Sequence, residues 1–266
     1  MRDPAAAPII VTRPRHDAVR WVEALRQRGL AAEALPLIDI TPATNPRPLE
    51  AAWREIDRYR ALMFVSGNAA EHFFAFRPGL ARGDAAPTGL AARCWATGPG
   101  TLAALRQAGV DPASIDAPGV LSGQFDSEAL WQVVGPTVGR GDQVLVVRGG
   151  APGGDGAGRN WFADQLAARG AEVGFVVAYE RHPPSWSALQ QDRARQATRD
   201  GSIWLLSSSE AIAHLRHSLP AAGLGTARAV ATHPRIAMAA REAGFGVVCE
   251  SRPTLDDVAA SIESLA

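Results

Sequence analysis

The sequence predicts an α/β protein made of two flavodoxin-like parallel-sheet domains related by internal duplication. Short apolar runs alternate with amphipathic helical stretches, which is typical of parallel sheets because each parallel strand needs a crossover helix. Whole phrases of sequence recur half a chain apart, and 266 residues suit two domains better than one.

Each apolar run predicts a strand, and a helical pattern follows most of them. The first run, 8–12, precedes a helical pattern over 16–29 that ends at Gly29, a residue typical of helix C-termini. The other predicted strands are 62–66, 93–97, 144–148, 203–207, 229–232 and 247–250.

The duplication is clearest in two helical phrases. ATGPGTLAALRQAG at 96–109 recurs as ATHPRIAMAAREAG at 231–244, an offset of 135 positions. At an offset of 141, MFVSGNAA (63–70) matches WLLSSSEA (204–211), and Gly29 matches Gly170. The segments 33–42 and 172–184 are likewise equivalent. Each follows a predicted helix, is predicted to be extended and ends in proline. Four matches in the same order predict a twofold repeat.

Composition restricts the classes of function. Basic and acidic residues number 27 each, so no net charge attracts the chain to nucleic acid or to an acidic membrane. Every basic residue is an arginine, and the absence of lysine excludes Schiff-base chemistry and a P-loop. Cys94 and Cys249 are expected to be buried, reduced thiols of a cytoplasmic protein. No segment reads as a signal peptide or a membrane span.

Common catalytic motifs are missing from the sequence. It holds no G-x-S-x-G, H-E-x-x-H or C-x-x-C pattern, and the glycine-rich tract 149–158 lacks a nucleotide-binding fingerprint. That tract is either a flexible surface insertion or a mobile flap. His214 and His217 stand one helical turn apart, which favours an ordinary helix face over a metal pair, so no metal is predicted.

Small hydroxyl residues stand where four predicted strands give way to helices: Ser66, Thr97, Ser207 to Ser209, and Thr232. Such residues either cap the helix or help its free N–H groups to bind carboxylates and phosphates. Because open parallel sheets bind ligands at the carboxyl ends of their strands, these positions are candidate binding residues. Arg13 and Arg148 end equivalent predicted strands. The guanidinium of each can donate two parallel hydrogen bonds to a carboxylate.

Tyr179 is one of only two tyrosines and follows an apolar run in VVAYERHPP. It either packs as an aromatic at a domain junction or faces a cleft between the lobes, where a phenol can donate a proton.

Taken together, these segments resemble the uroporphyrinogen-III synthase family over almost the whole chain. The resemblance is carried by VTRP (11–14), LRQRG (25–29), PLIDITP (36–42), FVSGNAA (64–70), ATGPGTLAAL (96–105), FDSEAL (125–130), VLVVRGG (144–150), GRNWFADQLAARGAEV (158–173), AYERHPP (178–184), LLSSSEA (205–211), ATHPRIAMAA (231–240) and PTLDDVAASI (253–262).

The resemblance implies a fold and a domain plan. Residues 1–37 with 183–266 would form one discontinuous α/β domain and 43–174 the other, with 38–42 and 175–182 as a two-stranded interdomain connector. It also implies a cytoplasmic lyase, expected to be a monomer, that needs no cofactor.

The implied reaction belongs to haem and tetrapyrrole biosynthesis. The enzyme would remove water from hydroxymethylbilane, a linear tetrapyrrole with acetate and propionate arms. It would then close the ring with inversion of ring D through a spiro intermediate, which gives uroporphyrinogen III. Transient contact with hydroxymethylbilane synthase, which supplies the unstable substrate, is the other expected partnership.

The resemblance also implies site residues. Tyr179 matches the tyrosine of the family and is the expected proton donor to the leaving hydroxyl. His233 and Ile236 replace a usual Gly and Thr, so His233 is expected either to bind a propionate or to pack. The expected substrate-binding residues are Arg13, Ser66, Asn68, Thr97, Gly98, Ser127, Arg148, Ser207, Ser208, Thr232 and His233.

Two other classes of protein remain open from the residues alone. A non-catalytic two-lobed binding protein for an anionic small molecule explains the duplication but not the specific phrases. A scaffold without a ligand leaves the paired Arg and the Ser/Thr strand ends unexplained.

Overall fold

The computed structural model describes residues 7–77, 90–119, 122, 124–154, 161–220 and 223–265. The chain divides into two compact units, which are described separately. The first unit combines Met1–Ile40 with His182–Ala266, and the second is Thr41–Arg181. Residues 175–181, which the resemblance implies to be connector, therefore group with the second unit.

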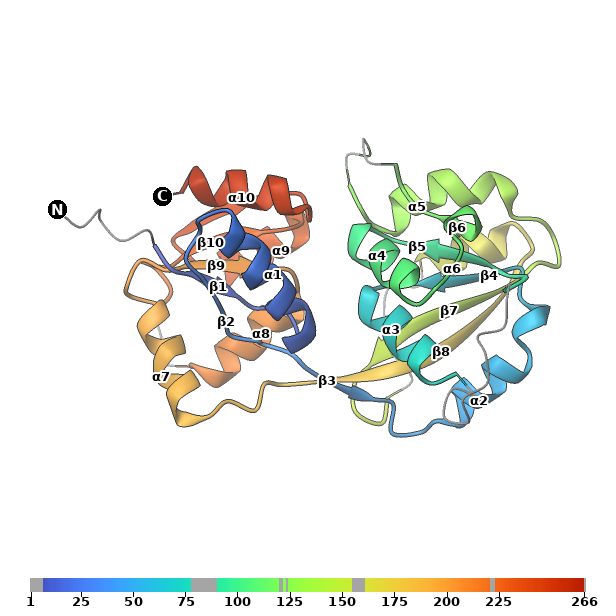
Figure 1. Cartoon of the computed structure of the whole chain (residues 1–266), viewed down its shortest axis with the longest axis horizontal. Coiled ribbons are helices and arrows are strands. Elements are labelled where there is room, and N and C mark those ends of the chain that lie inside the picture. Colours follow the sequence, from blue (N-terminus) through green and yellow to red (C-terminus); the bar gives the residue numbers. More distant parts are fainter. Residues whose placement is uncertain are drawn as a thin grey trace. The chain divides into compact units, whose positions relative to one another are not determined.

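The first unit is built on a five-stranded parallel sheet in the order β11-β10-β9-β1-β2 (Figure 1). Followed along the chain, this is the 2-1-3-4-5 order of flavodoxin-like folds. The strands are β1 (Ile9–Val11), β2 (Ala32–Ala34), β9 (Ile203–Leu206), β10 (Arg228–Ala231) and β11 (Val247–Glu250).

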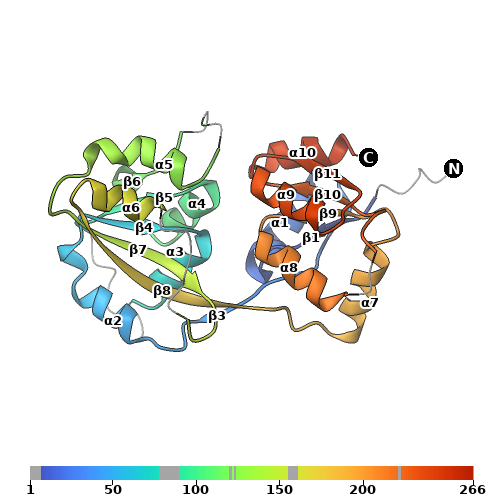
Figure 2. The same cartoon turned by 180° about the vertical axis from the view of Figure 1, so that it is seen from behind.

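Helices cover both faces of this sheet, because the side chains of a strand alternate between its faces. Ile9 and Val11 pack toward α1 (Arg15–Gln27) and α10 (Leu255–Glu263). Ile10 packs on the opposite face, whose apolar cluster also takes in α7 (Ala188–Ala197), α8 (Ser209–Ser218) and α9 (Pro234–Glu242), seen from behind in Figure 2.

The second unit holds a six-stranded sheet in the order β3-β8-β7-β4-β5-β6. Its strands are β3 (Asp39–Pro42), β4 (Ala61–Phe64), β5 (Arg93–Ala96), β6 (Ile115–Asp116), β7 (Gln143–Gly150) and β8 (Glu172–His182). The pairings from β8 across to β6 are all parallel.

Aromatic rings fill one side of this second sheet. Trp53 of α2 (Arg47–Arg54) stacks on Phe73 of α3 (Gly67–Ala75), and Phe73 meets Phe64 of β4 edge to face. The other face packs Met63 against α5 (Ser127–Val134) and α6 (Trp161–Ala168). The remaining elements are α4 (Pro99–Gln107) and 3-10 turns at Ile56–Arg58, Pro112–Ser114 and Gly135–Thr137.

The internal duplication is visible in the lateral order of the strands. Neighbours β1, β9 and β10 of the first sheet correspond to neighbours β7, β4 and β5 of the second, as the sequence offsets predict. The repeated glycines also share one conformation. Gly109 and Gly244 follow α4 and α9 with φ of 83° and 96°, in the left-handed region that favours glycine at helix ends.

The predicted strands are all present, but two expectations need correction. The tract 149–158 does not begin as a surface insertion, because Gly149 and Gly150 are the buried last residues of β7. Residues 151–154 are exposed, and 155–158 lie outside the described residues. Cys94 is buried in β5 as expected, whereas Cys249 is partly exposed because β11 lies at the edge of its sheet.

Two features are absent from the described residues. None of the described helices combines the length and the apolar character that crossing a membrane requires. Within the same residues, no group of three or more His, Cys, Asp or Glu side chains is arranged to hold a metal ion. His214 instead uses Nδ1 to bond the carbonyl oxygen of Leu37, at 2.8 Å.

Candidate active site

Tyr179 lies within β8, not at its end, and only 5% of it is exposed. Strand β7 separates β8 from β4, so the ring has to extend across β7 to reach the residues that follow β4. It does so, and its phenol oxygen lies 3.1 Å from Oγ of Ser66. The tyrosine that the sequence singles out is therefore held in a fixed orientation.

Ser66 stands at the turn between β4 and α3. Its Oγ caps the helix by accepting a hydrogen bond from the backbone N–H of Ala69, at 3.1 Å. The phenol of Tyr179 thus bonds to a side chain at the positive end of the α3 dipole, where negative charge is stabilised.

His72, one turn along α3, stacks on the ring of Tyr179 with 5.5 Å between ring centroids and 29° between planes. Burial lowers the pKa of His72 below its usual 6.5, although the Glu71 carboxylate opposes this shift. The imidazole is therefore neutral at pH 7. His72 was not predicted from the sequence, because only its place six residues after Ser66 distinguishes it from the other histidines.

Arg13 lies two residues after β1, Arg148 lies within the equivalent strand β7, and each guanidinium stacks on an aromatic ring. Arg13 lies 4.3 Å from the ring centre of Trp21, and Arg148 lies 4.2 Å from that of Phe175. Such stacking orients the planar fork of an arginine. These stacking partners could not be predicted from the sequence, because Trp21 and Phe175 differ in residue type and do not align in the repeat.

Arg13 is further distinguished by its burial. Its Nε is shielded from solvent and bonds to none of the described residues, while the nearby Asp17 is bonded to Arg20. Burial lowers the pKa of Arg13 from 12.5 to about 10, although Asp17 opposes this shift. The side chain remains cationic at pH 7, which leaves a partly buried positive charge able to bind a carboxylate.

The predicted hydroxyl residues divide into two kinds. Ser66 and Ser208 cap α3 and α8. Thr97 and Thr232 do not cap helices, which differs from the capping role considered for them. Their hydroxyls donate to the carbonyl oxygens of Val65 (3.3 Å), just after β4, and Leu206 (3.4 Å), the last residue of β9. A threonine hydroxyl has a single proton, so in this arrangement it is already used within the fold.

The cap of α9 is His233, whose Nδ1 accepts the backbone N–H of Arg235 at 3.1 Å. A ring nitrogen that accepts carries no proton, so the other nitrogen, Nε2, carries it in the neutral ring. Gly98 is the cap position of α4, and a methyl group there would lie 3.2 Å from Cβ of Phe125.

The remaining predicted binding residues lie at the starts of helices. Ser207 immediately precedes the cap of α8, and Asn68 lies in the first turn of α3. Ser127 is the first residue of α5, but the cap of that helix is Asp126, which accepts from Ala129 N–H at 2.9 Å.

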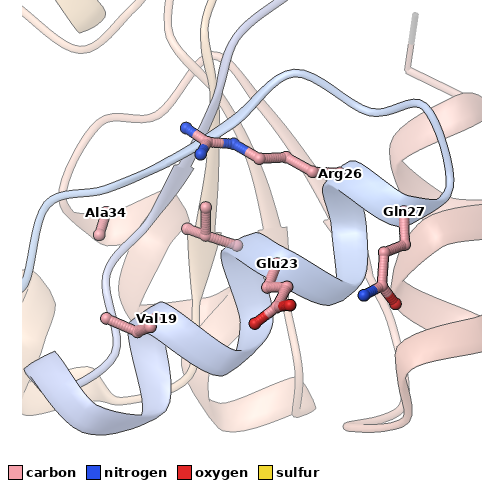
Figure 3. A pocket seen from close by; sticks show the side chains of 6 residues that line it. Val19, Glu23, Arg26, Gln27 and Ala34 are labelled. Atoms are coloured by element: carbon pink, nitrogen blue, oxygen red, sulfur yellow. The ribbon is translucent and has the colours of Figure 1, made fainter.

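The described surface of the first unit also carries a pocket. It is formed between α1 and β2 in the first unit, and Figure 3 shows side chains of α1 projecting around it. None of the predicted site residues lines it. Its lining residues are Val19, Val22, Glu23, Arg26, Gln27 and Ala34.

Two parallel α/β units, with polar side chains at the carboxyl ends of their strands, define the class of the molecule as a two-domain α/β protein. Solved structures share this fold. Uroporphyrinogen-III synthetase from Helicobacter pylori matches with a TM-score of 0.57 and 16% identity, over 97% of this chain and 100% of that chain. A mutant uroporphyrinogen III synthase from Thermus thermophilus matches with a TM-score of 0.54 and 16% identity, over 97% of both chains.

Sequence comparison identifies the family. The family model described as uroporphyrinogen-III synthase HemD matches residues 19–260. A curated uroporphyrinogen-III synthase from Chlorobaculum parvum is 27% identical over 201 residues, which are 75% of this chain and 73% of that protein. The chain belongs to the uroporphyrinogen-III synthase HemD family. Its activity is that of a uroporphyrinogen-III synthase, a hydro-lyase of tetrapyrrole biosynthesis.

Proposed function

We propose that this chain converts hydroxymethylbilane to uroporphyrinogen III with Tyr179 as the proton donor. Loss of the hydroxyl group of ring A, assisted by the pyrrole lone pair, gives an electrophilic azafulvene and water. Ring D attacks through its substituted carbon, and the resulting spiro intermediate fragments and closes again with ring D inverted. The observation that carries the role of Tyr179 is its bond to Ser66 at the start of α3.

The proposed role requires the phenol proton of Tyr179 to point away from Ser66. Either oxygen of the pair can donate. In the proposed arrangement Ser66 Oγ accepts from the N–H of Ala69 and donates its own O–H to the phenol oxygen of Tyr179. In this arrangement the phenol keeps its proton for the leaving hydroxyl. The developing phenolate is stabilised by Ser66 and by the dipole of α3.

Arg13 and Arg148 are the proposed anchors for the acetate and propionate arms. The support is that the two residues align in the repeat, at the equivalent strands β1 and β7, and that they stack on Trp21 and Phe175. At Thr97 and Thr232 the proposed donors are backbone N–H groups of the following helices, because the hydroxyls bond within the fold. The neutral His233 is proposed to contact a propionate through Nε2–H. Asn68, Gly98, Ser127, Ser207 and Ser208 complete the proposed binding set.

Residues 38–42 and 175–182 are proposed to connect the two domains, and the enzyme to act as a cytoplasmic monomer. Cys94, whose thiol is unpaired and buried, fits a reducing compartment. Transient contact with hydroxymethylbilane synthase would shorten the time that the unstable substrate spends in solution.

The experiment that tests the role of Tyr179 compares the only two tyrosines of the chain. Tyr179→Phe is expected to lower kcat for isomer III formation about ten- to a hundredfold, because the substrate is already reactive and general-acid effects are then modest. Tyr59→Phe, in the second unit but without a bond to Ser66, is the matched control and should retain wild-type turnover. Wild-type turnover by Tyr179→Phe would remove this residue from the mechanism.

A further inference from the structure

Because the ring of Tyr179 crosses β7, the surface of β7 beneath the ring must be free of side chains. Neighbouring strands lie about 4.8 Å apart, so β8 and β4 are separated by about 10 Å with β7 between them. The ring of Tyr179 has to pass over the surface of β7 before its oxygen reaches Ser66. Any side chain on β7 beneath the ring would block this path.

Gly149 occupies that position. It pairs with Tyr179 in the register of β7 and β8, just after a local irregularity between Arg148 and Gly149. A methyl group on Gly149 would lie 2.4 Å from Cζ and 2.6 Å from Cε2 of Tyr179. These distances are far below van der Waals contact, so an alanine here and the observed ring position exclude each other.

The requirement for glycine at this position concerns space and not backbone conformation. Gly149 is not among the glycines with positive φ. Its methyl would also approach Nη1 of Arg181 at 2.6 Å, but that atom ends a long side chain that can move away. The ring of Tyr179 has no such freedom, since its oxygen bonds Ser66 and its face stacks on His72.

We propose that Gly149 is a positioning residue for the uroporphyrinogen-III synthase reaction, because its missing side chain lets Tyr179 lie across β7 with its phenol on Ser66. The proposal rests on the proposed function of Tyr179 and extends it to a residue that has no side chain. It assigns a definite role to the first glycine of the tract 149–158.

The other copy of the duplication shows that the fold does not require this arrangement. At the offset of 135 that aligns Arg13 with Arg148, Gly149 aligns with Pro14. At the offset of 141, Tyr179 aligns with Ile38, a buried apolar residue. The first unit thus forms the same parallel sheet with neither the glycine nor the tyrosine, as expected if both serve catalysis in the second unit.

The test is Gly149→Ala in the full-length chain, assayed for isomer III formation. We expect kcat to fall about as far as in Tyr179→Phe, ten- to a hundredfold, with KM changed about twofold or less. Gly174→Ala, on β8, is the matched control, because its methyl would lie at an ordinary 3.4 Å from Leu145. That variant should keep both kcat and KM.

A double-variant comparison separates positioning from a general loss of folding. Tyr179→Ala removes the ring that the new methyl would strike. Adding Gly149→Ala to Tyr179→Ala should therefore lower kcat by less than about twofold and leave the unfolding midpoint unchanged. A further tenfold loss in the double variant would show that Gly149 acts independently of Tyr179 and would overturn the proposal.

A spectroscopic measurement reports the ring directly. With 3-fluorotyrosine incorporated, the chain gives two fluorine signals, and that of Tyr179 is the one lost in Tyr179→Phe. Gly149→Ala should shift the Tyr179 signal and leave that of Tyr59 in place. An unshifted signal together with wild-type kcat would overturn the proposal. If the wild-type protein itself forms no isomer III, the proposed function fails instead, and the signal still tests the ring position.

Discussion

At the scale of single residues, burial decides which polar groups can react. Cys94 lies buried in β5, and burial raises the pKa of its thiol from 9.0 to about 12, although the neighbouring Arg93 opposes this shift. Because the thiolate is the reactive form, Cys94 is protected both by its missing charge and by its position. Cys249, on the edge strand β11, is partly exposed.

This difference predicts selective thiol modification. At pH 8, Ellman's reagent should modify one thiol per native chain within minutes, and the second only after guanidinium is added. Cys249→Ser should abolish the fast reaction, which assigns it. Two thiols that react at equal rates in the native protein would contradict the burial of Cys94.

Residue-scale features differ in how far the sequence predicts them. Tyr179 and Arg13 could be chosen as candidates because their residue types carry chemistry and their positions match a repeat or a family motif. Gly149 could not, since its role depends on which ring crosses its strand, and only the lateral order β8-β7-β4 reveals that. Likewise, whether Thr97 caps a helix or bonds Val65 depends on a local geometry that residue type leaves open.

At the scale of elements, the repeated helix endings explain why the duplication can still be recognised in the sequence. After α4, the N–H of Gly109 bonds the carbonyl of Arg106, and the next N–H, of Val110, bonds that of Leu105. After α9, Gly244 bonds Arg241, and the next residue bonds Ala240, in the same two-bond pattern. This Schellman ending needs a left-handed residue, so glycine is retained in both copies.

We therefore expect Gly109→Ala and Gly244→Ala each to lower the free energy of unfolding by about 1 kcal/mol, the cost of a left-handed conformation for a residue with a Cβ. No atom lies within 4 Å of either new methyl, so no clash adds to this cost. Gly100→Ala is the matched control, because Gly100 lies in α4, is exposed, and also has open space around it.

The control should unfold at the same or a higher urea concentration, since alanine favours helix more than glycine does. Urea titrations of the three variants provide the measurement. Destabilisation of Gly100→Ala equal to that of the other two would show that the left-handed conformation is not the cause.

Among the elements, strands that coincide with an apolar run were predictable even when they are short, as for the three residues of β1. Apolar runs such as 144–148 predict a central strand because both faces of a parallel sheet are covered. The two residues of β6 form an edge strand that is too short to leave a pattern in the sequence.

At the scale of the whole molecule, one duplicated α/β unit has become two units with different chemistry. Both sheets keep the same lateral order of equivalent strands. Each also has an arginine stacked on an aromatic ring, Arg13 just after β1 and Arg148 within β7. Only the second unit has the tyrosine on β8 that bonds Ser66. The duplication therefore accounts for the proposed binding residues in both units, and the departure from it accounts for the proposed proton donor.

The most direct test of this account is the identity of the product. Hydroxymethylbilane is generated in place by its synthase, the purified chain is added, the products are oxidised, and the isomers are separated by chromatography. We predict that uroporphyrin III predominates, whereas the protein-free control gives uroporphyrin I by spontaneous closure. Uroporphyrin I alone in the presence of the chain would contradict the account.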